Sequence, residues 1–229
     1  MLWLNIQAPF AAFRTFSAGS FRPTAGFIPP SAAYGLLLNL AGIEMRRNDG
    51  KSPMSLIATD LPRADIAIGA RAEPGRHSLF QQLHNYPVGS SGAEHAPACK
   101  GSKYNITPAR RAFLSDLRAC IGLRGNDDLA ERVRAGLRGG GPARYGLPFL
   151  GDNSYLLDRA DILDAPVPAR WLVPLDPKQD RFEPAAGEPM RLTVTIDRAD
   201  MSNTVSRLFR MAPQPASEVP DEAWITVAY

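Results

Sequence analysis

The N-terminal block at residues 9–44 constrains the fold of this chain more than any other stretch. It reads PFAAFRTFSAGSFRPTAGFIPPSAAYGLLLNLAGIE and begins like a strand, followed by a loop rich in Arg, Thr, Ser and aromatic residues. After the double proline, Ser31 is expected to cap a helix of about 13 residues, ending at Ile43. This order places a cationic loop beside a helix start, which favours a site for an anionic ligand.

Hydrophobic periodicity predicts the other regular elements. An amphipathic helix is expected at 127–138, with acidic residues in its first turn and Arg138 in its last. The segment 76–102 has no sustained period and is expected to form a protruding hairpin or a partly mobile insertion. Alternating apolar residues predict strands at 2–7, 65–70, 110–124, 170–175, 190–197 and 223–228. The resulting β-α-β…α-β order predicts an α+β fold of the ferredoxin-like (RRM) type.

The charge of the chain is distributed unevenly along its 229 residues, a length that suits a single domain. Residues 1–99 hold 8 Lys/Arg against 6 Asp/Glu, and residues 100–144 hold 10 against 4. Residues 145–229 hold 8 against 13, which leaves a net charge of +3. The basic middle predicts a face for polyanions, and the acidic C-terminal third predicts a face for protein neighbours or solvent.

Cysteine usage and hydropathy predict a cytoplasmic protein. Cys99 and Cys120 form no CxxC motif and no disulfide framework, which indicates a reducing compartment. Asn5 and Gln7 interrupt the apolar start, so a signal peptide is not expected. The longest apolar run, 31–43, is shorter than the ~20 residues of a spanning helix, so no membrane partner is expected.

The sequence predicts no metal site, no cofactor and no nucleotide hydrolysis. It has no HExxH motif, no zinc-ligand spacing, and no GxxxxGKS order in its glycine-rich stretch GGGPARYG. One catalytic alternative stays open, because metal-free RNA cleavage needs only a general acid/base and a cation near the phosphate. The residues available for it are His77, His84, Tyr86, Lys100, Lys103 and Tyr104.

Cationic and aromatic side chains cluster along the sequence in a way typical of single-stranded RNA binding, where arginines contact phosphates and aromatic rings stack on bases. Each also has a structural interpretation: Phe13, Phe21 and Phe27 as core, and Tyr34 packed on the sheet. The cations are Arg14, Arg22, Lys103, Arg110, Arg111, Arg118 and Arg144, with Phe13, Phe16, Phe21, Tyr104 and Tyr145 nearby in sequence.

The stretch RPTAGFIPPSAAYGLLLNLAGIE resembles the N-terminal signature of the CRISPR-associated Cas-five (Cas5) family of the RAMP superfamily. RRAFLSDLRACIGL and RYGLPFLGDNSYL resemble two later stretches of that family in the same order. LFQQLHNYP and GSKYNITPARRAFLSDLR are most similar to its Myxococcus-type subgroup. The resemblance covers about residues 1–157.

The resemblance implies a RAMP/RRM-like domain over 1–229, with a β-hairpin thumb at 76–112 and a β-rich C-terminal extension at 158–229. Such subunits cap the 5′ handle of the guide RNA (crRNA) in a Cascade-type complex and contact its backbone subunit and large subunit. Target DNA is then read by guide pairing and reaches this subunit only indirectly. Together with the charge pattern, the resemblance predicts the RNA-binding residues Arg14, Phe16, Arg22, Thr24, Ser31, Tyr34, Lys103, Tyr104, Arg110, Arg111 and Arg144.

The type I-C branch of the family is a guide-processing endoribonuclease that uses Tyr, Lys and His. In this chain Lys103 is followed by Tyr104 and no histidine directly follows a lysine, which favours a non-catalytic role over an enzyme. A third alternative is a scaffold that joins proteins through the acidic C-terminal third.

Overall fold

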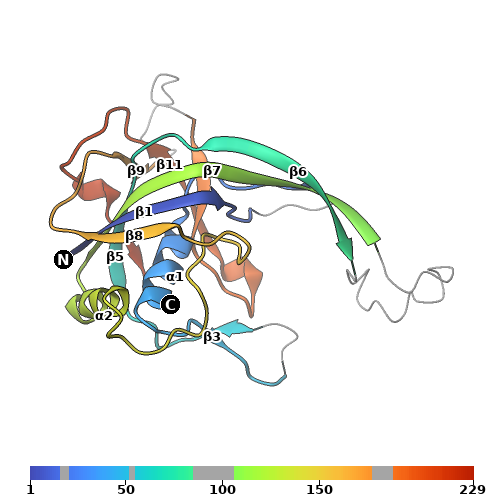
Figure 1. Cartoon of the computed structure of the whole chain (residues 1–229), viewed down its shortest axis with the longest axis horizontal. Coiled ribbons are helices and arrows are strands. Elements are labelled where there is room, and N and C mark those ends of the chain that lie inside the picture. The colour runs from blue at the N-terminus through green and yellow to red at the C-terminus, as the bar shows by residue number, and fades with distance from the viewer. Residues whose placement is uncertain (16–20, 52–54, 85–105, 177–187) are drawn as a thin grey trace.

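A computed structural model describes residues 1–15, 21–51, 55–84, 106–176 and 188–229 (Figure 1). The described residues form a ten-stranded sheet, a separate two-stranded sheet and two α-helices. Every strand pair is antiparallel except the pairing of β2 with β7. The fold is therefore mixed, with a mostly antiparallel sheet, as expected for the α+β class.

Four strands in the order β5-β7-β1-β8 form one part of the sheet, with β8 at its edge. β1 (Leu2–Ala11) pairs with β7 (Ile106–Arg124) on one edge and with β8 (Arg159–Leu163) on the other. β5 (Ala64–Ala70) pairs with the opposite edge of β7. The remaining strands are β2 (Phe21–Arg22), β3 (Arg46–Arg47), β4 (Leu56–Ile57), β6 (Gly75–His84), β9 (Arg170–Pro174), β10 (Met190–Thr195), β11 (Val205–Met211) and β12 (Ile225–Val227).

Both helices lie on one face of this sheet (Figure 1) and enclose the main core with it. Strand alternation sends Leu2, Leu4 and Ile6 of β1 into this core. Helix α1 (Pro30–Leu40) follows β1 and the short strand β2 in the chain. Its buried residues lie around nearly the whole circumference of the helix. The helix therefore supplies core rather than an exposed face.

The predicted cap of α1 is wrong. The helix begins at Pro30, its N-cap is Pro29, and no side chain bonds the free amides there. Proline suits the first helical position because its φ is already helical and it has no N–H to satisfy. The helix ends at Leu40, three residues before the predicted end, because Gly42 turns the chain with φ +67°.

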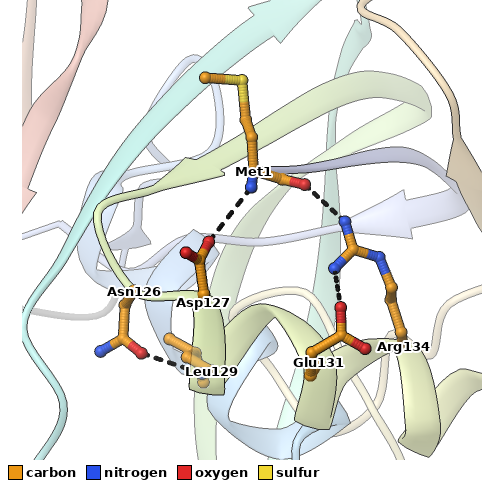
Figure 2. A network of polar contacts seen from close by, with 6 residues as sticks. All are labelled: Met1, Asn126, Asp127, Leu129, Glu131 and Arg134. Carbon is orange, nitrogen blue, oxygen red and sulfur yellow. Dashed lines mark hydrogen bonds and ion pairs between the residues drawn. The ribbon is translucent and has the colours of Figure 1, made fainter.

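Helix α2 (Asp127–Leu137) is anchored at its start by side chains. Asn126 Oδ1 accepts a hydrogen bond from the Leu129 amide at 2.9 Å, an N-cap. Asp127 pairs with the Met1 amine at 3.3 Å, and Arg134 donates to the Met1 carbonyl (Figure 2). These contacts hold the helix against the beginning of β1.

The opposite face of the sheet carries a smaller apolar cluster around the three tryptophans of the chain. The ring of Trp3 lies 6.1 Å from that of Trp171 and 5.6 Å from that of Trp224. Trp171 is fully buried and donates its indole N–H to the Ala216 carbonyl at 2.8 Å. This cluster reports on folding of the central and C-terminal strands together.

Beyond the body of the sheet, β6 and the first half of β7 form a two-stranded ribbon that extends outward (Figure 1). Its register runs from Gly75↔Ser115 to His84↔Ile106. The sequence shows no period over β6 because this strand is exposed on both faces, as Leu79 and Phe80 show. Residues 76–84, for which the sequence shows no period, lie in the regular strand β6.

Among the other strands of five residues or more, β8 and β11 were not predicted. β8 has the sequence RADIL and lies at the edge of the sheet, where none of its residues is fully buried. β11 alternates poorly because Arg207 and Arg210 interrupt its apolar residues. Neither α-helix in the described residues is long and apolar enough to span a membrane.

Candidate nucleic-acid interface

Four of the predicted cationic residues, Arg14, Arg22, Arg110 and Arg111, lie where the ribbon leaves the sheet. β2 runs parallel to β7 there, with Phe21 opposite Arg110 and Arg22 opposite Arg111. Just before β2, Arg14 forms an antiparallel bridge with Thr24. The two arms of the N-terminal loop therefore lie together beside β7.

Arg76 reaches the same place from β6. A Cβ on Gly26 would lie only 2.5 Å from a guanidinium nitrogen of Arg76, so this side chain lies across the loop that leads to α1. Arg110 donates its Nε–H to Ser78 Oγ at 3.1 Å, which holds it against β6. Glycine at position 26 permits the close approach of the arginine.

We call Arg14, Arg22, Arg76 and Arg110 the arginine surface. Arg14, Arg76 and Arg110 are exposed and Arg22 is half-buried. No ion pair with an acidic side chain is found for Arg14, Arg76 or Arg110 within the described parts of the chain. Exposed guanidinium groups that are not neutralised are suited to bind phosphates.

Arg111 differs from Arg14, Arg76 and Arg110 because it pairs with a carboxylate among the described residues. Its guanidinium contacts the Asp152 carboxylate and lies over the Tyr155 ring, 5.1 Å from the ring centre. Burial acts to raise the pKa of Asp152, but hydrogen bonds from Ser154 and Arg111 outweigh it and hold the pKa below its usual value. Arg111 therefore supports the turn at 152–155, and Arg118 is likewise paired, with Asp116.

Other residues predicted to contact RNA bond within the protein. Tyr34 is fully buried, donates to the Pro62 carbonyl at 2.6 Å and stacks on Tyr229, so its ring offers no surface to a ligand. Ser31 is buried beside it in α1. The Thr24 hydroxyl accepts from the Phe13 amide at 2.9 Å. Arg144 donates to the Gly136 carbonyl at 2.9 Å, near the end of α2.

The three phenylalanines that were expected in the core do not all lie there. Phe13 and Phe27 are buried in the core, as one interpretation predicted. Phe21 is 47% exposed and belongs to the surface. Phe16, Lys103 and Tyr104 lie outside the described residues.

Most of the residues of the catalytic alternative also lie outside the described part of the chain. Only the side chain of His77 is placed, and its Nε2 lies 2.8 Å from Ser115 Oγ. His84 ends β6, but its side chain is outside the described set, as are Tyr86 and Lys100. Among the described residues, no group of three His, Cys, Asp or Glu side chains is arranged to hold a metal ion.

An aromatic cluster on the other face of the ribbon from Arg76 and Arg110 was missed. The rings of Phe10 and His77 both contact Phe113, at centre distances of 5.6 and 5.3 Å, and Tyr155 lies 6.2 Å from Phe10. These residues come from β1, β6, β7 and the turn before β8, so only the strand register brings them together. Arg76 was missed for the same reason.

Comparison with known proteins decides the family. A sequence profile described as "CRISPR-associated protein (Cas_Cas5)" matches residues 1–204. The chain belongs to the CRISPR-associated Cas5 family. The match extends well beyond residue 157, where the resemblance of the sequence motifs ends. No curated protein sequence matches the chain.

Two solved structures resemble the Cas5 chain along most of its length. One, described as "CRISPR RNA-guided surveillance complex", is 14% identical with a TM-score of 0.58 and covers 97% of this chain and 95% of its own. The other, "Crystal structure of Cas protein", is 16% identical with a TM-score of 0.44 and covers 96% and 97%. The first likeness shows that the overall fold is shared.

Proposed function

We propose that this Cas5 chain is a non-catalytic RNA-binding subunit of a Cascade-type CRISPR surveillance complex, where it caps the 5′ handle of the guide RNA. The observation that carries the proposal is the arginine surface around the loop 21–27, in which Arg14, Arg76 and Arg110 pair with no carboxylate among the described residues. Single-stranded RNA is held by such groups through its phosphates. Membership of the Cas5 family also supports this role, as does the fold shared with a structure described as a CRISPR RNA-guided surveillance complex.

The topology supports a ferredoxin-like interpretation of the body. The order β5-β7-β1-β8, with a helix after β1 and a helix after β7, is the order of a split β-α-β fold. The β6–β7 ribbon supports the thumb interpretation, since it extends from β5 and β7 as an insertion between adjacent strands of this order. Both assignments are part of the proposal.

The arrangement also favours separate faces for RNA and protein partners. The arginine surface lies at the base of the ribbon, and strands β9 to β12 of the acidic C-terminal third lie beyond β5. Within the complex, we propose that this chain contacts the backbone subunit and the large subunit. Target DNA is recognised by the guide, so this chain needs no base-specific contact with it.

The test is assembly of the complex with guide RNA, using a tag on the backbone subunit. The variant Arg14→Ala/Arg22→Ala/Arg110→Ala is expected to lose at least about tenfold in bound guide RNA, since hydrogen bonds to charged groups contribute about 1.5–3 kcal/mol each. The control Arg63→Ala/Arg132→Ala/Arg138→Ala removes the same charge near α2. Equal guide RNA in both variants would refute the handle assignment.

A second experiment separates binding from cleavage. Purified protein incubated with precursor RNA in EDTA is expected to bind without producing defined fragments. Defined fragments that disappear in His77→Ala would establish the endoribonuclease alternative instead, because His77 is the described side chain with general acid/base chemistry at the ribbon.

A further inference from the structure

We propose that a groove between β1 and the segment before β8 docks a neighbouring protein subunit of the complex, through an apolar side chain that lies next to a lysine or arginine. The groove has a volume of about 270 Å³ and is lined by Pro9, Phe10, Ser154, Tyr155, Leu156, Leu157 and Asp158. By strand register, Phe10 lies on the face of the ribbon opposite Arg76 and Arg110. The inference rests on the proposed function and names the chemistry of one protein contact within it.

The surface around the groove is apolar and exposed. Phe10 is 46% exposed and Leu156 is 43% exposed, and both line the groove. Phe149 forms an antiparallel bridge with Leu156 and is also exposed, so the apolar surface continues beyond the groove. Large exposed apolar side chains that adjoin one another, rather than standing singly, are typical of a protein contact.

Contacts within the chain hold the groove in shape. The Leu150 amide donates to the Tyr155 carbonyl at 3.0 Å, and the Ala12 amide donates to the Leu150 carbonyl at 3.2 Å. The Asp158 amide donates to the Gln7 carbonyl at 3.0 Å, which fixes the segment before β8 against β1. A preformed groove loses little entropy when a partner binds, which favours docking.

The charge of the groove favours a basic protein segment over RNA. Asp158 is exposed and forms no ion pair within the described parts of the chain. Arg159, the next residue, pairs instead with Asp161 at 2.6 Å. Arg111, which lies over a ring of the groove, pairs with Asp152. The groove therefore keeps a negative charge that repels phosphate and attracts a lysine or arginine.

A photocrosslinker identifies the occupant directly. We would place p-benzoylphenylalanine at position 156 in the complex assembled from this chain, the backbone subunit, the large subunit and guide RNA. Irradiation is expected to link it to a protein segment that has a lysine or arginine next to the site of attachment. The same crosslinker at position 201, an exposed methionine before β11 at the other end of the strand order, is expected not to reach that segment. A crosslink to the guide RNA, to a segment without a basic residue, or to nothing would overturn the inference.

Leu156→Asp tests the apolar part of the contact. It is expected to reduce one protein subunit that co-purifies with the tagged chain by at least about tenfold, the effect of losing a central interface residue. Met201→Asp is the matched control and is expected to keep every subunit. Both side chains are exposed, so unfolding followed by tryptophan fluorescence is expected to be unchanged in both variants.

Asp158→Asn tests the charge of the contact. It is expected to lower retention of the same subunit about twofold at about 0.1 M salt, and the difference is expected to vanish near about 1 M because salt screens exposed charges. Asp164→Asn, at an exposed carboxylate just after β8, is the control. No loss, or an equal loss at both salt concentrations, would contradict a basic partner.

The same complex separates this inference from the proposed function. If Leu156→Asp keeps every subunit while the triple arginine variant loses guide RNA, the inference fails and the proposed function stands. If Leu156→Asp loses guide RNA but keeps every subunit, the groove binds RNA and the inference is overturned. If the wild-type chain co-purifies with neither guide RNA nor another subunit, the proposed function fails with it.

Discussion

The two halves of the N-terminal block lie in opposite environments. The loop half, with Arg14 and Arg22, lies at the surface beside the ribbon, whereas the helix half, with Tyr34 and Leu37, is buried between the sheet and α2. A contiguous family signature therefore serves two purposes. The helix half holds the fold together, and the loop half presents charge to a ligand.

The largest effect is expected in the helix half. Leu37→Ala removes a fully buried side chain and is expected to lower the free energy of unfolding by about 2–5 kcal/mol. Denaturant unfolding followed by the fluorescence of the Trp3–Trp171–Trp224 cluster measures it. Below the unfolding transition, RNA affinity is expected to stay unchanged, and a loss of affinity without a loss of stability would break the division between the halves.

Gly151→Ala tests the turn before β8, which packs against the loop half at Ala12 and Phe13. Gly151 has φ +79°, and a Cβ there would lie 2.1 Å from the Ala12 carbonyl oxygen. We expect a loss of about 1–3 kcal/mol in stability, the usual range for a strained backbone position. Gly146→Ala is the control, since no atom lies within 4 Å of a Cβ at that position. Equal thermal midpoints for the two variants would contradict the packing described.

Tyr34→Phe sharpens the assignment of a residue that sequence reasoning placed in the RNA site. The change leaves the Pro62 carbonyl without its donor and is expected to cost about 1–2 kcal/mol of stability. RNA affinity is expected to be unaffected. Tyr145→Phe, at a 44% exposed ring, serves as the neutral control for stability. If Tyr34→Phe weakens RNA binding at unchanged stability, Tyr34 belongs to the site after all.

The smallest effect is expected at the Asp152–Arg111 pair. Because the folded-state pKa of Asp152 is lowered, the pair stabilises the protein above the unfolded pKa of about 3.9 and loses this contribution as pH falls through the folded-state value. The contribution is expected to be below about 1 kcal/mol, since the carboxylate is partly exposed. Urea unfolding of wild type and Asp152→Asn should differ at pH 6 and converge near pH 2–3. A constant difference across this range would contradict the ionic role of Asp152.

Much of the body was predictable because large aliphatic residues alternate along its strands and α2 is amphipathic. β1, β5 and the second half of β7 alternate clearly, and α2 has an amphipathic stripe with a charged first turn. The regular strand β6 and the edge strand β8 were not, since β6 is exposed on both faces and β8 is short with no fully buried residue. Ser31 was misplaced because serine and proline both favour a helix start, and here proline occupies it.

The site was predictable only in its charge. Arg14, Arg22 and Arg110 stand out by composition, but the approach of Arg76 to Gly26 and the contacts of Phe10 with Phe113 depend on register between distant strands. Sequence also does not distinguish a paired arginine from an open one. Arg111 and Arg110 are neighbours in the chain, yet only Arg111 pairs with a carboxylate among the described residues.

The most direct test of the arginine surface is the salt dependence of single-stranded guide RNA binding by the purified protein. Each phosphate contact contributes roughly 0.7 to the slope of log affinity against log salt. Arg14→Ala/Arg22→Ala/Arg110→Ala is therefore expected to reduce the slope by about 2, while Arg63→Ala/Arg132→Ala/Arg138→Ala leaves it unchanged. Equal slopes in the two triple variants would show that the RNA binds elsewhere on the protein.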